Sequence, residues 1–267
     1  MTHLSFSEFT EFVQYVTLEV SSIINKHFDL NILNTRRKSD GTLVTDADLT
    51  AEKYIREQIN LHFENHAILG EEFDDHLKNN HFSWVIDPID GTYSFANGVP
   101  LFGTLIGFMK SHVPLYGSLR LPRLGNELLV GNNEICLRNG QSSKCGEFIS
   151  WEESLILTTD EIRISNSPFC SSWNSLKKLG PTSRTWGDCY GYYLLCIGLA
   201  DVMVDIDLKS YDILPLIPVL KGAGLKIVDF SLEKDLSSSQ FRSASKALAE
   251  DDPIDWVEFN LAIADIK

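Results

Sequence analysis

The stretch Trp84-Val85-Ile86-Asp87-Pro88-Ile89-Asp90-Gly91-Thr92 is the part of the sequence from which the fold and the chemistry can be read. Its first residues are aromatic or β-branched, so we expect a buried strand that the proline ends. Proline fixes φ and donates no backbone hydrogen bond, so the chain turns out of the sheet. Asp87 and Asp90 then converge on one side of the turn. Two carboxylates and the free carbonyl of Ile89 suit a hard cation.

The same stretch has a second interpretation, in which the two acids only face water at the end of a capped strand. For an isolated pair of acids three residues apart, that interpretation is the better one. The complete string favours a ligand site, because Gly91 permits close backbone approach and Thr92 can begin a helix whose N–H groups face an anion. The stretch therefore predicts a cation that bridges to a phosphate group.

Further acids occur at the ends of other predicted elements. Glu71 and Glu72 follow an apolar residue and a glycine, and Asp212 begins an apolar segment. Alone, a pair of glutamates usually lies in a solvated loop, and an aspartate at a helix start is favoured by the helix dipole. A site for two metal ions, however, needs more oxygen ligands than Asp87 and Asp90 supply. The three acids therefore become candidate ligands.

Hydrophobic periodicity divides the rest of the chain into helices and strands. Helical spacing of apolar residues predicts helices over 5–28, 45–63, 168–179, 190–199 and 211–220. Strand patterns occur at 81–86, 101–109, 113–119, 155–157, 202–204 and 225–228, with a hairpin within 130–137. Pro215 and Pro218 either occupy the first turn of the last helix or kink it. Helices followed by strands, twice over, predict a layered α/β architecture with two sheets.

Composition narrows the class of protein and of ligand. The chain has 267 residues, of which 43% are hydrophobic and 22% are charged, as in globular proteins. Its formal net charge of −14 repels phosphodiester backbones, so nucleic acid is not an expected partner. A phosphate ligand would need bound cations to cancel that repulsion.

The cysteines, histidines and apolar segments indicate the cellular setting. Five cysteines without a C-x-x-C motif favour reduced thiols over a disulfide framework or a zinc site. The seven histidines are scattered and are read as surface or structural residues. The sequence shows no secretory signal and no apolar segment long enough to span a membrane, so we expect a cytoplasmic protein that does not bind membranes.

Three motifs resemble, in their order along the chain, the signatures of the inositol monophosphatase superfamily. Its members are Mg²⁺-dependent, lithium-sensitive phosphomonoesterases. The motifs are Gly70-Glu71-Glu72, the string from Asp87 to Thr92, and Tyr211-Asp212. The resemblance extends from Lys38 to Gly224. It implies a layered αβαβα sandwich of the inositol monophosphatase and fructose-1,6-bisphosphatase type, and a homodimer. We expect one phosphatase domain over 1–267, with a lobe at 1–150 that carries the metal and phosphate motifs and a substrate-side lobe at 151–267.

The resemblance also implies a role for individual residues. It implies two or three Mg²⁺ ions per site, with Mn²⁺ as a possible substitute and Li⁺ as an inhibitor. The implied metal ligands are Glu71, Asp87, the Ile89 carbonyl, Asp90 and Asp212. Gly91 and Thr92 would bind the phosphate, and Asp48 would pair with the Thr92 hydroxyl to position the attacking water, with Glu71 also assigned to catalysis. Lys38 and Glu72 are possible further members of the site.

The second signature departs from the family pattern, and a nearby stretch bears on the substrate. Tyr211, Leu214, Pro215 and Gly222 replace residues usual in the family, so helix packing or the dimer contact is expected to differ, although the acid at 212 is kept. The run from Trp186 to Tyr192 resembles the histidinol-phosphatase branch, which implies a place in histidine biosynthesis.

Histidinol phosphate carries an ammonium group and an imidazole, which an extra pocket carboxylate would bind. We therefore expect Asp188 to contact the substrate. The resemblance implies a contact for Asp205 as well, because relatives often carry an acid that contacts the leaving group seven residues before the residue equivalent to Asp212. The alternative for Asp188 is that it caps the helix beginning near Tyr190. Three functions remain open: hydrolysis of histidinol phosphate or inositol phosphate, hydrolysis of 3′-nucleotide or sugar bisphosphates, and phosphate binding without catalysis.

Overall fold

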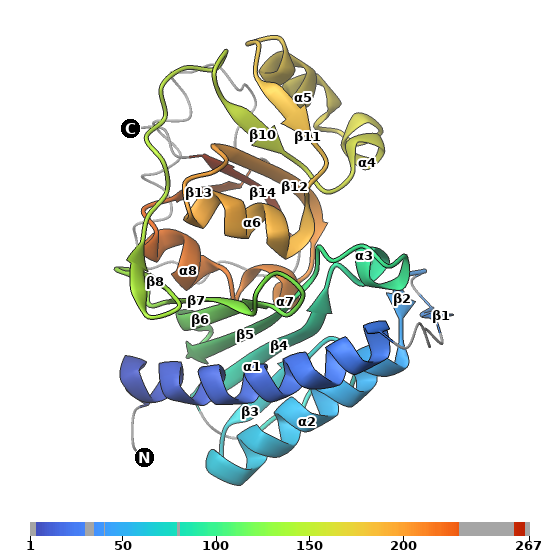
Figure 1. Ribbon diagram of the computed structural model, residues 1–267, viewed down its shortest axis with the longest axis vertical. Helices are drawn as coiled ribbons and strands as arrows, with labels where there is room; N and C mark the ends of the chain where they lie inside the picture. Colours follow the sequence, from blue (N-terminus) through green and yellow to red (C-terminus); the bar gives the residue numbers. More distant parts are fainter. Residues whose placement is uncertain (1–3, 30–34, 40, 79–80, 230–258, 265–267) are drawn as a thin grey trace.

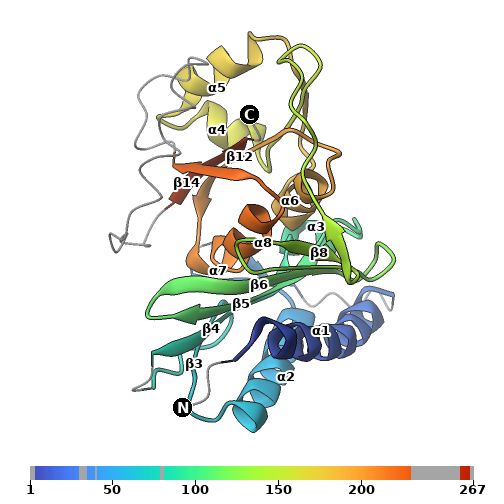
Figure 2. The same ribbon diagram turned by 90° about the vertical axis from the view of Figure 1, so that its left-hand side faces the viewer.

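The computed structural model describes residues 4–29, 35–39, 41–78, 81–229 and 259–264. Its elements form five alternating layers of helices and sheets (Figures 1 and 2), so the predicted αβαβα sandwich is confirmed. From one end to the other, the layers are α1 (Phe6–Asp29) with α2 (Asp46–His62), a seven-stranded sheet, α6 (Asp188–Cys196) with α7 (Ser210–Ile213) and α8 (Ile217–Gly222), a five-stranded sheet, and α4 (Glu161–Ser165) with α5 (Cys170–Lys177).

The larger sheet has the strand order β3-β4-β5-β6-β7-β8-β9. Its strands are β3 (Ala67–Gly70), β4 (Phe82–Asp90), β5 (Gly103–Lys110), β6 (Val113–Leu121), β7 (Glu127–Gly131), β8 (Cys136–Arg138) and β9 (Gln141–Ser143). The first two strands are parallel and the others pair antiparallel. A small hairpin of β1 (Arg36–Arg37) and β2 (Leu43–Val44) precedes α2, and the short helix α3 (Thr92–Ala96) follows β4.

The smaller sheet has the order β11-β10-β12-β14-β13. Its strands are β10 (Leu155–Leu157), β11 (Thr182–Arg184), β12 (Val202–Leu208), β13 (Lys226–Asp229) and β14 (Phe259–Ala264). The expected strands at 155–157, 202–204 and 225–228 are present, whereas α4, β11 and β14 have no counterpart in the sequence prediction.

The core between the first two layers is aromatic. The apolar stripe of α1 buries Phe9 and Phe12, whose rings lie 5.8 and 5.1 Å from that of Trp84 on β4. Behind this cluster, Trp84 Nε1 donates a 3.1 Å hydrogen bond to Nδ1 of the buried His66. His66 therefore has the structural role expected of the histidines. Among the described helices, none is both long and apolar enough to cross a membrane, and all five cysteines are free thiols.

The expectation that Pro88 ends its strand is wrong, because β4 continues through it to Asp90. The register against β5 shifts between Asp87 and Asp90, which is the mark of a β-bulge. Pro88 lies within this irregularity, where the ladder does not require its missing N–H. Its carbonyl accepts a 2.9 Å hydrogen bond from the Thr104 hydroxyl. The bulge places both acids at the C-terminal end of β4, next to the middle layer of helices.

The expected helix over 211–220 is divided in two. Pro215 lies in the break between α7 and α8, and Pro218 occupies the first turn of α8, where no intrahelical donor is needed. This segment packs against three glycines that pair with one another across β5, β6 and β7: Gly107, Gly117 and Gly131. We call them the glycine strip.

The glycine strip lets the backbone of residues 215–219 lie directly on the sheet. A Cβ atom at Gly107 would lie 2.9 Å from Cα of Pro215, one at Gly117 would lie 1.8 Å from the Pro215 carbonyl oxygen, and one at Gly131 would lie 2.4 Å from Cα of Val219. The strip therefore accommodates Pro215 and Pro218, and it fixes the distance between the sheet and the segment that links α7 to α8.

Candidate active site

Three of the predicted metal ligands converge where the larger sheet meets the middle layer. Asp87 and Asp90 come from the bulge of β4, and Asp212 lies in the first turn of α7. One carboxylate oxygen from each lies within 4.8 Å of the others. Carboxylate oxygens grouped in this way could together hold one hard divalent cation.

Backbone N–H groups hold these carboxylates in place. Asp212 accepts a 2.7 Å hydrogen bond from the N–H of Lys209, and Asp87 accepts a 3.0 Å hydrogen bond from the N–H of Ile89. Asp90 accepts a hydrogen bond from the N–H of Cys189, in the first turn of α6. The Asp90 carboxylate is therefore held across two layers by α6, whereas Asp87 and Asp212 are held by the backbone of their own segments.

The electrostatics of the cluster fit a cation. Burial, followed by the charges of neighbouring acids, raises the pKa of Asp87 and of Asp90 well above the usual range. Burial also raises the pKa of Asp212 to about 7, with Glu71 and Asp188 adding to the effect. A divalent cation among these groups would favour the ionised form of each and reverse the shifts. Acids packed at this density have the oxygen chemistry that Mg²⁺ prefers.

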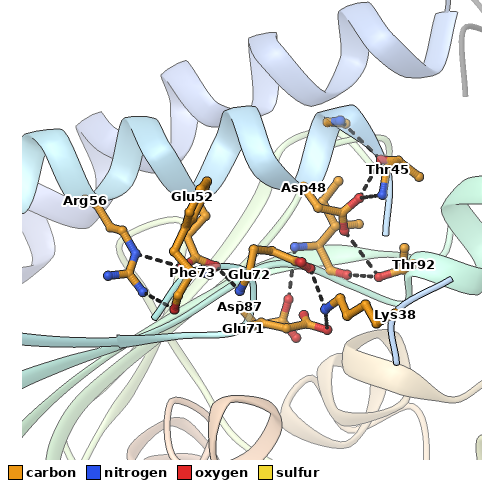
Figure 3. A network of polar contacts seen from close by, with 12 residues as sticks. Lys38, Thr45, Asp48, Glu52, Arg56, Glu71, Glu72, Phe73, Asp87 and Thr92 are labelled. Atoms are coloured by element: carbon orange, nitrogen blue, oxygen red, sulfur yellow. Dashed lines mark hydrogen bonds and ion pairs between the residues drawn. The ribbon is translucent and has the colours of Figure 1, made fainter. Parts of the chain in front are cut away.

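Lys38 lies between the two glutamates of the first signature (Figure 3). Its ammonium nitrogen is 2.8 Å from Glu71 Oε1 and 2.9 Å from Glu72 Oε1. Burial, followed by the charge of Glu71, raises the pKa of Glu72 to about 8. The negative charge of Glu71 also helps to raise the pKa of Asp87, after burial. The structure thus brings Glu71 next to the acid cluster and ties Glu72 to Lys38.

Asp48 and Thr92 lie next to each other, close to Lys38 (Figure 3). Thr45 and Asp48 form a capping box at the start of α2, which fixes the Asp48 carboxylate. The Thr92 hydroxyl is 2.9 Å from the Ile89 carbonyl oxygen and 3.3 Å from Asp48 Oδ1. Burial raises the pKa of Asp48 to about 6, so the group is ionised at neutral pH and can accept a proton.

A cavity of about 690 Å³ opens beside these groups. Gly91 and Thr92 line it from the start of α3, and Gly187 and Asp188 line it from the start of α6. Gly91 has a left-handed φ of 88°, and a Cβ atom there would lie 2.9 Å from the Leu101 carbonyl oxygen. Glycine is therefore required at this turn, both by its backbone conformation and by the close approach of the neighbouring loop.

The two predicted substrate contacts lie in an adjoining recess of about 110 Å³. Asp188 is the first residue of α6, and the cap position belongs to Gly187 with no side-chain cap, so the alternative that Asp188 caps this helix is wrong. Asp205, on β12, is buried and accepts hydrogen bonds of 2.9 Å from both the N–H and the hydroxyl of Thr159, and one of 3.2 Å from the Tyr192 hydroxyl. Burial raises the pKa of Asp188 to about 6 and that of Asp205 to about 7.

Sequence reasoning missed three contributors to the site: Thr159, Arg163 and the N–H of Cys189. Thr159 bonds Asp205 and accepts a 2.9 Å hydrogen bond from the N–H of Asp188, and Arg163 lines both cavities. The signal that could have indicated them is the polar run that directly follows β10, because functional residues gather where strands end in loops.

Comparison with known proteins places these features in a family. The model of the inositol monophosphatase family matches residues 6–257. A histidinol-phosphatase of Chlorobaculum parvum is 33% identical over 198 residues, which cover 74% of this chain and 76% of that protein. The chloroplastic bifunctional phosphatase IMPL2 of Arabidopsis thaliana is 32% identical over 220 residues, which cover 80% of this chain and 63% of the length of that protein.

Solved structures agree on the fold. An IMPase of Thermotoga maritima superposes with a TM-score of 0.77 at 21% identity, and the match covers 96% of this chain and 91% of the other. Inositol monophosphatases generally use Mg²⁺, which agrees with the acid cluster at the end of β4. The chain belongs to the inositol monophosphatase family of phosphomonoesterases.

Proposed function

We propose that this chain hydrolyses histidinol phosphate to histidinol and phosphate in a Mg²⁺-dependent reaction. The observation that carries the proposal is the charge of the recess next to the acid cluster. Six aspartates and one cationic side chain line it: Asp90, Asp160, Asp188, Asp205, Asp207 and Asp212, with Arg163. The similarity to a histidinol-phosphatase supports the same substrate.

The charge balance distinguishes an amino-alcohol phosphate from a polyol phosphate. When Asp90 and Asp212 hold a cation, Asp188 and Asp205 still give the recess negative charge. An ammonium or imidazolium group gains from a carboxylate in such a partly buried site, since the low local dielectric strengthens the attraction. Inositol 1-phosphate presents only hydroxyl groups there and has no charge to match.

We assign the metal ligands to Glu71, Asp87, the Ile89 carbonyl, Asp90 and Asp212. Bound Mg²⁺ would supply the positive charge that activates a water and stabilises the leaving oxygen. On the protein side, the N–H groups of Gly91 and Thr92 would bind the phosphate. The Thr92 hydroxyl would orient the water and pass a proton to Asp48, whose Oδ1 lies 3.3 Å away.

The remaining expectations follow from the family. Lobe 1–150 would supply the metal and phosphate groups, and lobe 151–267 the substrate side and Asp212. A homodimer in the cytoplasm stays a prediction, and sedimentation of the purified chain would test its oligomeric state.

Phosphate release tests the proposed function. The purified chain is assayed on histidinol phosphate, inositol 1-phosphate and an aryl phosphate, with Mg²⁺ and with EDTA. We expect release only with Mg²⁺ and the highest kcat/KM for histidinol phosphate. Faster hydrolysis of inositol 1-phosphate would contradict the substrate, and no release from any substrate would leave phosphate binding without catalysis.

One isosteric variant tests the substrate contact. Asp188→Asn removes a hydrogen bond between charged groups, which is worth about 1.5–3 kcal/mol, or roughly 10–100-fold in kcat/KM. The loss should fall on histidinol phosphate and not on the aryl phosphate. Asp201→Asn is the matched control, because Asp201 accepts a 2.7 Å hydrogen bond from the N–H of Leu155 and does not line either cavity.

A further inference from the structure

A buried carboxylate on α2 holds the loop that carries Glu71. Glu52 is fully buried and lies one helical turn after Asp48 (Figure 3). Its two oxygens accept hydrogen bonds of 2.8 Å from the N–H of Glu72 and 3.3 Å from the N–H of Phe73. A buried carboxylate is stable only with such partners, so this contact fixes the direction of the loop as it leaves β3.

Arg56, one helical turn further along α2, contacts both Glu52 and the same loop. Its Nε donates a 2.7 Å hydrogen bond to Glu52, and its Nη2 donates one of 2.9 Å to the carbonyl of Phe73. A third bond, of 3.2 Å, reaches the carbonyl of Asp74, and the guanidinium lies 5.8 Å from the centre of the Phe73 ring. Glu52 and Arg56, which we call the loop clamp, thus hold both the donors and the acceptors of one turn.

The glycine before Glu71 is shaped to the loop clamp. A Cβ atom on Gly70 would lie 2.1 Å from Glu52 Oε1 and 2.6 Å from Arg56 Nη2. Any side chain at this position would therefore push both members of the clamp away. Glu71 is therefore flanked by two residues that contact the clamp. Gly70 packs against it, and Glu72 donates its N–H to Glu52.

We propose that Glu52 and Arg56 are positioning residues that hold the Glu71 carboxylate at the acid cluster and so set the affinity of the site for its divalent cation. The inference rests on the proposed function, in which Glu71 is a metal ligand. With its backbone fixed on both sides, Glu71 loses little further freedom when it binds the ion. Substituting a residue that orients a metal ligand typically weakens metal binding by about 10–100-fold.

Calorimetric titration with Mg²⁺, without substrate, measures this effect directly. Glu52→Gln keeps the shape of the side chain but removes the charge that holds Arg56 and the two N–H groups. We expect its Kd for Mg²⁺ to rise about 10-fold. The Mg²⁺ concentration for half-maximal phosphate release should rise in parallel, while kcat at saturating Mg²⁺ falls less. Hydrogen exchange at the amides of Glu72 and Phe73 should accelerate.

Glu127→Gln is the matched control for this variant. Glu127 also accepts hydrogen bonds from an arginine and from a hydroxyl, those of Arg138 and Tyr193, but it lies on β7 away from the cavities. Its substitution should leave the Kd for Mg²⁺ unchanged. If Glu52→Gln does not fold, as judged by circular dichroism, Arg56→Gln carries the same prediction from the other half of the clamp.

A double variant shows whether the clamp acts through Glu71. In a Glu71→Gln background, Glu52→Gln should add less than twofold to the Kd, because coupled residues are not additive. An unchanged Kd in Glu52→Gln with accelerated exchange at Glu72, or a full additive loss in the double variant, would overturn the inference. If the unsubstituted chain itself binds no Mg²⁺, the proposed function fails, and accelerated exchange alone then shows a clamp without a role at a metal site.

Discussion

Substituting the central residue of the glycine strip should inactivate the protein from a distance. In Gly117→Ala, the new Cβ would lie 1.8 Å from the carbonyl oxygen of Pro215, whereas ordinary contacts begin at 3.4 Å. The segment 214–216 must therefore rise by about 1.6 Å, and it carries α7 with it because the N–H of Leu214 is bonded to the carbonyl of Ser210 at 3.0 Å. Overpacking of this kind costs about 1–3 kcal/mol of stability.

The larger effect should be on catalysis, because α7 carries Asp212, which we propose as a metal ligand. Misplacement of a catalytic group by about 1 Å can lower the rate roughly 100-fold. We therefore expect Gly117→Ala to lose about 100-fold in kcat/KM for phosphate release, with a fall in Tm of about 2–4 °C per kcal/mol.

Two variants at neighbouring positions should show smaller losses of activity than Gly117→Ala. Gly107→Ala meets Cα of Pro215 at 2.9 Å, so it needs a smaller shift and should lose less activity. Ser118→Ala removes only the hydrogen bond from Ser118 to the Ile106 carbonyl and should keep near-normal kcat/KM. A Gly117→Ala protein within twofold of the unsubstituted enzyme would refute the reasoning.

Three further predictions concern the site and the core. Asp90→Asn should lower kcat by orders of magnitude at saturating Mg²⁺ while circular dichroism stays unchanged; near-normal turnover would remove Asp90 from the ligand set. Thr92→Ser should keep much of the phosphate-release rate and Thr92→Val should lose most of it, because only the first keeps the hydroxyl beside Asp48; equal rates would show that the hydroxyl has no chemical role. Burial lowers the pKa of His66, and its neutral ring accepts a hydrogen bond at Nδ1 from Trp84. The neutral residue therefore contributes its full stability above the unfolded-state pKa of about 6.5. This contribution is lost as the pH falls through the lower pKa of the folded state. The fall in Tm between pH 7.5 and 5 should therefore be smaller in His66→Phe than in the unsubstituted chain, and an equal fall would exclude His66 as a source of acid sensitivity.

Local signals predicted those parts of the structure that local interactions determine. The helix over 45–63 was recognisable because Thr45 and the acids after it form a cap within a single turn. Asp87 and Asp90 were recognisable because their spacing and the following glycine are consecutive in the sequence. In both cases the residues that decide the conformation are neighbours in the chain.

Where partners are distant in sequence, the prediction failed. The continuation of β4 through Pro88 depends on Thr104 of the adjacent strand, and the break between α7 and α8 depends on the glycines beneath it. Glu52 has the pattern of an ordinary helix glutamate, and only the folded loop shows that it is buried. Such contacts have no local signature, because each is created by how the layers pack.

The placement of the acids on separate layers has a consequence for how the enzyme fails under stress. Asp87 and Asp90 belong to one sheet, Asp212 to the helices between the sheets, and Asp205 to the other sheet. A slight parting of the layers separates these groups while every strand keeps its hydrogen bonds. In rising urea, inactivation should therefore precede the loss of secondary structure, because local opening requires less free energy than global unfolding. Catalysis here reports on docking between layers more sensitively than any spectroscopic measure of their content.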